Sequence, residues 1–216
     1  MTTDGVINRA TLAAYGVCCL AFLATIPYSP YPGSLLTKAL PVLILLGLAL
    51  VALRGRVRVL LALALLLSAC GDVLLELKFF TPGLAAFLIA QLCYAWYFFS
   101  QRDTANLPVA RLLIVLALMC TASVPVISNA GELLIPVAVY MMAIGLMGIS
   151  AALYRKPSTV LFVGALLFVA SDSMIGFNRF VSPLPAAHYA IMMTYYGAQL
   201  LILWGVLATE KHPRQA

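Results

Sequence analysis

The chain has 216 residues, of which 64% are hydrophobic and only 9% are charged. A soluble domain cannot hide that much apolar surface from water, so the composition excludes the ordinary globular classes and indicates an integral membrane protein. The net charge of +6 comes from basic residues that gather between the apolar runs, which points to orientation in a bilayer and excludes a nucleic-acid partner.

The apolar runs are continuous, rich in Leu and Ala, and do not alternate with polar residues. Lipid accepts only helices and closed barrels, and this pattern favours helices. We therefore predict an all-α integral membrane protein, a single bundle of eight transmembrane helices in one polytopic domain over residues 1–216. The expected spans, each near the length that a bilayer requires, are Arg9–Pro27, Leu35–Leu53, Val57–Leu77, Leu84–Phe99, Pro108–Ile127, Leu133–Tyr154, Thr159–Phe177 and Ala186–Ala208.

Basic residues predict which way the bundle faces. With eight spans both chain ends lie on one side, and cytoplasmic loops carry an excess of Lys and Arg. The other side collects only Lys38, Lys78 and Arg179. We therefore expect both termini in the cytoplasm, on the side that holds Arg9, Arg54, Arg56, Arg58, Arg102, Arg111, Arg155, Lys156, Lys211 and Arg214.

Two aspartates interrupt the apolar spans, in "SACGDVLLEL" and in "VASDSMIGFNRF". Asp72 and Asp172 each follow a basic loop by a similar stretch of helix, which is a rise of about 20 Å and places them at similar depth in the outer half of the membrane. A charge at the centre of a bilayer costs about 3 kcal/mol on insertion scales, so such residues normally face a partner or a cavity. A matched pair favours a functional pocket over a structural Asp–Lys pair.

Other polar residues of the spans map to the same depth, and His188, Tyr195 and Gln199 share one helical stripe. Structural roles for these residues stay open as alternatives to a functional pocket. The tyrosines can lie at the membrane interface, the glutamines can bond neighbouring helices, Lys38 can extend its ammonium group to the lipid headgroups, and His188 can be solvated. Glu76 and Glu132 lie near span ends, where we expect them to be solvated. The substrate-binding candidates are Lys38, Gln91, Tyr94, Tyr140, Asn178, Arg179, Tyr195 and Gln199.

The chemistry that this pair suggests is general acid–base catalysis. One carboxyl can stay protonated as an acid while its neighbour stays ionised as a base or as a stabiliser of a cation. The five cysteines lie inside apolar runs at no metal-ligand spacing, and no serine-hydrolase elbow, zinc signature or phosphate loop is present in the sequence. We therefore predict no metal site.

An ordered set of segments resembles the YhhN family of membrane lysoplasmalogenases. These segments, from the second to the eighth span, are "LLTKALPVLILLGL", "SACGDVLLEL", "AVYMMAIGLM", "GALLFVASDSMIGFNRF" and "YYGAQLLI". The resemblance implies eight spans, hydrolysis of the vinyl ether bond of a lysoplasmalogen, and Asp72 and Asp172 as the catalytic carboxylates. One departure is Gln91 in "AQLCYAW", where a His is expected, because Gln cannot exchange a proton near neutral pH.

The implied products are a fatty aldehyde and a glycerophosphoethanolamine or glycerophosphocholine. A protonated Asp would deliver a proton to the β-carbon of the vinyl ether, and an ionised Asp would stabilise the oxocarbenium ion and orient water. The sequence does not say which Asp takes which role. Lys38 or Arg179 would hold the lipid phosphate. The expected partners are the lysophospholipid and the bilayer, with no cofactor, in the inner membrane of a bacterial cell.

Two other classes use paired intramembrane aspartates. A proton-coupled carrier would relay protons through them, and it predicts helices broken at corresponding positions of two halves. An intramembrane aspartyl protease is echoed by "CGD", but its Tyr-Asp and Pro-Ala-Leu partners are missing from the sequence. The hydrolase is therefore the favoured prediction, and the carrier is its alternative.

Overall fold

The computed structural model describes residues 9–102, 107–155 and 159–210, and within them it is helical, with eight helices that are long and apolar enough to cross a membrane. The predicted all-α class is confirmed. Short 3₁₀ turns, Ile26–Tyr28 and Gly131–Leu133, follow α1 and precede α6. The helices are α1 (Arg9–Thr25), α2 (Ser34–Ala52), α3 (Gly55–Glu76), α4 (Phe80–Ser100), α5 (Val109–Ser128), α6 (Leu134–Ala152), α7 (Thr159–Phe180) and α8 (Ala187–Glu210).

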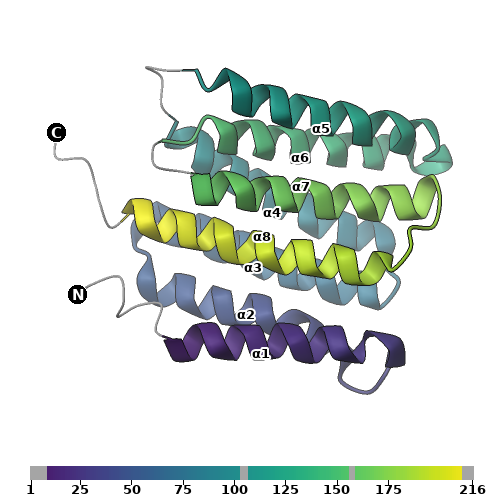
Figure 1. Ribbon diagram of the computed structural model, residues 1–216, viewed down its shortest axis with the longest axis horizontal. Helices are drawn as coiled ribbons and strands as arrows, with labels where there is room; N and C mark the ends of the chain where they lie inside the picture. Colours follow the sequence, from purple (N-terminus) through teal and green to yellow (C-terminus); the bar gives the residue numbers. More distant parts are fainter. Residues whose placement is uncertain (1–8, 103–106, 156–158, 211–216) are drawn as a thin grey trace.

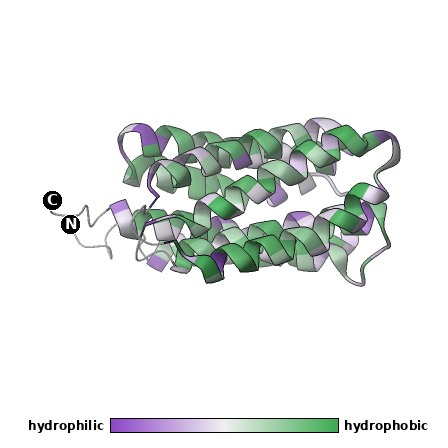
Figure 2. Ribbon diagram, turned by 90° about the horizontal axis from the view of Figure 1, so that it is seen from above, coloured by the Kyte–Doolittle hydropathy of each residue, from purple (hydrophilic) through white to green (hydrophobic). Residues whose placement is uncertain are grey.

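The helices pack in two layers, which Figure 2 shows one above the other. One layer holds α5, α7, α8 and α1 side by side, and the other holds α6, α4, α3 and α2. The inner pairs, α7–α8 and α3–α4, make the most extensive contacts of the bundle, and both described ends of the chain lie at the same end of it (Figure 1). The two aspartate-bearing helices, α3 and α7, therefore belong to the central pairs of opposite layers.

The start of α4 differs from the sequence prediction. The fourth span was predicted to begin at Leu84, but Phe80 already begins α4 and Pro82 lies in its first turn. Proline is tolerated there because the amides of the first turn have no partner within the helix. The turn between α3 and α4 is consequently short, and Lys78 adopts a positive φ of 65° within it.

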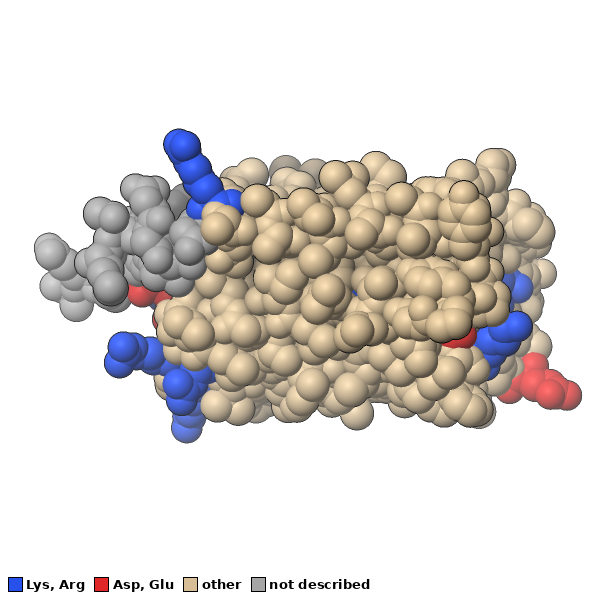
Figure 3. All heavy atoms as spheres, turned by 90° about the horizontal axis from the view of Figure 1, so that it is seen from below, with Lys and Arg blue, Asp and Glu red and all other residues tan. Residues whose placement is uncertain are grey.

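On the face that Figure 3 shows, charged side chains gather at the two ends of the bundle and the surface between them is almost free of charge. Large apolar side chains point outward, such as Val51 and Trp96, which are 81% and 72% exposed. Such a surface suits lipid and would be a liability in water. Lys156, Lys211 and Arg214, which the orientation prediction also uses, lie outside the described residues, and the orientation itself remains a prediction.

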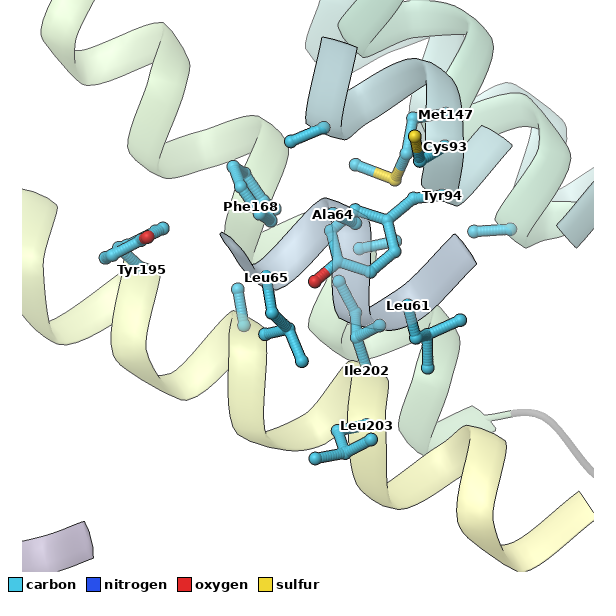
Figure 4. Packing of buried hydrophobic residues seen from close by; sticks show 14 of the residues in the cluster. Leu61, Ala64, Leu65, Cys93, Tyr94, Met147, Phe168, Tyr195, Ile202 and Leu203 are labelled. Carbon is cyan, nitrogen blue, oxygen red and sulfur yellow. The ribbon is translucent and has the colours of Figure 1, made fainter. Parts of the chain in front are cut away.

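Between the aspartates and the end of the bundle that holds the chain termini, a dense apolar core fills the space between the layers (Figure 4). Tyr94 and Phe98 of α4 stack at 5.8 Å, and Phe168 of α7 packs edge-on against Tyr94. These three rings are at most 1% exposed. This core separates the level of the aspartates from the end of the bundle where the chain termini lie.

Two glycines allow α7 and α8 to approach closely. A Cβ atom on Gly205 would lie 2.7 Å from the backbone nitrogen of Leu161, and one on Gly164 would lie 2.8 Å from the backbone nitrogen of Ile202. Because the obstacle is backbone, no side-chain rotation can make room. Small residues at such crossings let the helices of a membrane bundle gain close van der Waals contact.

We predict that Gly205→Val lowers the stability of the bundle by about 2 kcal/mol, the usual cost of overpacking a tight interface. The thermal unfolding midpoint in detergent measures this. The matched control is Gly197→Ala, also on α8, where an added Cβ would lie 3.4 Å from the Leu167 side chain, an ordinary contact distance. Equal midpoints for Gly205→Val and the parent would contradict this account of the α7–α8 contact.

Candidate active site

A pocket of about 390 Å³ lies between the two layers, at the end of the bundle away from the chain termini. It is bordered by the last turns of α3 and α7 and by the first turns of α4 and α8. Among the residues that the structure describes, no three His, Cys, Asp or Glu side chains gather as metal ligands would. The polar side chains that line the pocket include Lys38, Asp72, Glu76, Asp172, Arg179 and His188.

Asp172 enters the pocket from α7 and is 4% exposed. Its Oδ2 atom accepts two hydrogen bonds, one from the hydroxyl of Tyr140 at 2.8 Å and one from Nε2 of Gln91 at 2.9 Å. The donors come from α6 and α4, so three helices fix this carboxyl. Two donors on one oxygen favour the ionised carboxylate and leave Oδ1 to face the pocket.

Asp72 enters from α3, in the opposite layer, and is 3% exposed. The hydroxyl of Tyr195 on α8 donates to its Oδ2 atom at 2.8 Å. The preceding residue, Gly71, must be small, because a Cβ atom there would lie 2.5 Å from the ring of Phe87. The same Phe87 ring meets Tyr195 edge-on at 5.8 Å, so the "GD" sequence lets an aromatic wall form directly beside the carboxyl.

Glu76 is not solvated as the sequence predicted. Its side chain is 9% exposed and accepts a bond from Nζ of Lys38, itself 8% exposed, at 3.1 Å. The hydroxyl of Ser29 donates to its other oxygen at 2.7 Å. The reason is that Ser29, directly after the 3₁₀ turn that follows α1, and Lys38 of α2 both bond the carboxylate at the end of α3. Lys38 therefore has a carboxylate partner, and the snorkelling alternative does not describe it.

The other substrate-binding candidates fall into two groups. Asn178, Arg179 and Tyr195 line the pocket together with Lys38, and the Oδ1 atom of Asn178 also accepts a bond from the backbone N–H of Leu184. Gln91, Tyr94 and Gln199 do not line it. The Tyr94 hydroxyl of α4 donates to Oε1 of Gln199 on α8 at 2.7 Å, outside the pocket. Tyr140 borders an adjoining apolar pocket.

Among the residues that border the pocket and that the sequence did not identify as site residues, Glu76, His188 and Phe80 carry polar or aromatic contacts. Glu76 lies one helical turn beyond Asp72 on the same face of α3, a spacing that could have identified it. His188 borders the pocket at the start of α8, and its ring lies 6.1 Å from Phe22. Phe80 lies under the guanidinium of Arg179, 3.8 Å from ring centre to Cζ. No sequence signal marks that last contact, because it joins the start of α4 to the end of α7.

Comparisons with known proteins agree with one another. The sequence profile of the YhhN family matches residues 33–206. The chain is 36% identical to a lysoplasmalogenase of Mycobacterium bovis, with 94% of this chain and 83% of the relative covered. It is 39% identical to the human lysoplasmalogenase TMEM86B, with 88% and 83% covered, and 32% identical to human TMEM86A, with 85% and 82% covered. No solved structure matches the chain significantly.

Proposed function

The chain belongs to the YhhN family, and we propose that it is a membrane-embedded hydrolase of the vinyl ether bond of lysoplasmalogens. The observation that carries the proposal is the pair of buried aspartates, which reach one pocket from opposite layers of the bundle. The lysoplasmalogenases that the chain resembles support the substrate class. The products would be a fatty aldehyde and a glycerophosphoethanolamine or glycerophosphocholine.

The chemistry needs a proton donor and an anionic partner. Protonation of the β-carbon of the vinyl ether gives an oxocarbenium ion, water adds to the α-carbon, and the hemiacetal collapses to an aldehyde and the glycerol hydroxyl. One water is consumed and the proton is returned. A carboxylic acid supplies the proton, and a nearby carboxylate stabilises the cation and orients the water.

The hydrogen bonds support one assignment of these roles. Asp172 receives two donors on one oxygen, which favours its ionised form, so it is the carboxylate of the pair. Asp72 receives one donor, and Lys38, which lines the same pocket, is already paired with Glu76. Asp72 is therefore the acid. Gln91 acts as a positioning residue, and a neutral amide donor suffices for that, which accounts for Gln in place of the expected His.

Arg179 is the best candidate for the lipid phosphate. It lies at the pocket rim on α7, and within the described chain it forms no ion pair. Its guanidinium rests on the Phe80 ring, which pre-orients a planar donor group suited to phosphate oxygens. Lys38, held by Glu76, borders the pocket deeper inside and is a less direct candidate.

The continuity of the helices supports a hydrolase over a carrier. A carrier predicts interrupted helices beside its intramembrane site. Here α3 and α7 continue through Asp72 and Asp172 without a break, and the apolar core closes the bundle below them. We also propose that the protein lies in the inner membrane of a bacterial cell with both termini in the cytoplasm, in line with the distribution of its basic residues.

We predict that Tyr140→Phe lowers kcat about tenfold while KM changes little, because the lost hydrogen bond stabilises the carboxylate form of Asp172 that the transition state requires. Steady-state kinetics with a lysoplasmalogen measure both constants. The control is Tyr97→Phe, which removes a buried hydroxyl that bonds Glu210 at the opposite end of the bundle. A parental kcat in Tyr140→Phe would remove Tyr140 from the catalytic account.

The proposal is tested by incubating purified protein in detergent or in vesicles with an alkenyl lysophospholipid. Release of a fatty aldehyde together with the matching glycerophospho compound is expected, and the corresponding acyl lysophospholipid should stay intact. If no alkenyl lipid yields aldehyde, and reconstituted vesicles instead show proton-dependent solute uptake, the carrier replaces the hydrolase.

A further inference from the structure

A second, apolar pocket adjoins the first one on the far side of α7. It lies between α4, α6 and α7, and it shares Leu75, Phe80, Phe87, Asp172 and Ile175 with the polar pocket. Asp172 is the one carboxyl among its lining residues, and the remaining wall is aliphatic or aromatic apart from the hydroxyl of Tyr140. A polar and an apolar compartment therefore meet at a single carboxylate.

The vinyl ether bond likewise separates a polar part of the lipid from an apolar part. The glycerophospho part on the oxygen side is polar, and the chain on the carbon side is purely apolar. We propose that the polar pocket takes the glycerophospho part and that the apolar pocket takes the first methylenes of the alkenyl chain, with the reacting bond beside Asp172. This inference rests on the hydrolase function proposed above, and it adds a chain-binding site and the residues that set its size.

The apolar pocket is narrow, with a volume of about 30 Å³. That space is smaller than a chain of several methylenes, so a bound chain must displace part of the wall. Val126 of α5 and Met141 of α6 form the wall opposite Gly176. Helix α5 contributes few buried residues to the bundle, Val115 and Val126, and Val126 is the one that lines this pocket.

Gly176 lines the pocket and lies directly against this wall. A Cβ atom on Gly176 would lie 3.0 Å from Cγ1 of Val126 and 3.3 Å from Cε of Met141, which is closer than an ordinary contact. A larger side chain at this position would therefore press on both wall residues and fill the small space that the pocket offers the chain. Because Gly176 lies one turn beyond Asp172 on α7, it would act on the chain next to the reacting bond and not on the polar head. Gly176 is thus a specificity-determining position.

The test compares two substrates that share a headgroup, one with a hexadecenyl chain and one with a plain ethenyl group, which has no methylenes to place in the apolar pocket. Gly176→Val narrows the pocket and Val126→Ala widens it, so the two variants should move chain preference in opposite directions. The readout is the ratio of kcat/KM for the long chain to that for the short chain. Gly145→Ala on α6 is the control, since the atoms nearest to its Cβ would be those of Met119, at 3.5 Å and more, and neither residue lines the apolar pocket.

We expect Gly176→Val to lower this ratio about tenfold, the scale of discrimination that small changes in an apolar pocket bring about. Val126→Ala should raise the ratio, and Gly145→Ala should leave it at the parental value. Equal losses for both substrates in Gly176→Val, or a ratio that falls in Val126→Ala, would overturn the chain-binding site while the hydrolase stands. No aldehyde from either substrate with the parent protein would overturn the hydrolase itself.

Discussion

Replacing Asp72 or Asp172 by Asn is expected to lower kcat for vinyl ether hydrolysis about 10³-fold, within the range that general acid–base groups contribute. Asparagine keeps the shape of the side chain but neither delivers a proton nor carries a negative charge. In the assignment proposed above, Asp72→Asn removes the acid and Asp172→Asn removes the carboxylate that stabilises the cation. The double variant should be about as inactive as either single variant, because the two groups act in one step.

Aldehyde release measured at saturating substrate tests this, with size-exclusion profiles and thermal midpoints as the check on folding. Neither change should unfold the protein, since an amide is cheaper to bury than a carboxylate. Glu132→Gln is the matched control, because Glu132 is exposed in the turn before α6. A folded Asp72→Asn or Asp172→Asn variant with parental activity would contradict the paired-aspartate mechanism.

Breaking the ion pair between Lys38 and Glu76 should have the largest effect on stability. Both side chains are more than nine-tenths buried, so Lys38→Met leaves a carboxylate without its cation. Removing one partner of a buried pair costs about 3 to 5 kcal/mol. The thermal unfolding midpoint of Lys38→Met in detergent should therefore fall well below that of Gly197→Ala and of the parent.

The double variant Lys38→Met/Glu76→Gln separates the unpaired charge from the lost contacts. Glutamine retains an oxygen for the hydroxyl of Ser29 and carries no charge, so most of the lost stability should return. A double variant that is no more stable than Lys38→Met would mean that the destabilisation comes from lost packing around the lysine stem. A parental midpoint for Lys38→Met would remove the ion pair from the account of stability.

The helices could be predicted from the sequence because a bilayer demands apolar segments of nearly fixed length. All eight expected spans correspond to helices, with ends that differ by a few residues. The largest difference is at α4, which begins at Phe80 and not at the predicted Leu84, with Pro82 in its first turn. The order of helices within each layer could not be predicted, because packing partners are chosen by side-chain fit and not by hydrophobic period.

The aspartates could be predicted because a carboxylate inside a membrane span is costly to bury, and such residues usually mark a functional site. Their partners were harder to assign. Shared depth pointed to Tyr140, Tyr195 and Gln91, but depth alone does not say which side chains turn toward a carboxylate. Tyr94 lies at the right depth and yet bonds Gln199 behind the pocket. Glu76 was misjudged because the ends of membrane spans are normally exposed to water, and its two partners, Ser29 and Lys38, come from other parts of the chain.

The most direct test of the central claim is to run the reaction in D₂O and to trap the aldehyde by reduction as it forms. If an enzyme carboxyl protonates the β-carbon, the product carries a single deuterium on the carbon next to the former carbonyl, in one configuration. Water oxygen adds to the α-carbon, so the glycerophospho product keeps its original oxygen. Aldehyde with deuterium in both configurations equally, or with none, would contradict proton delivery by a positioned aspartate.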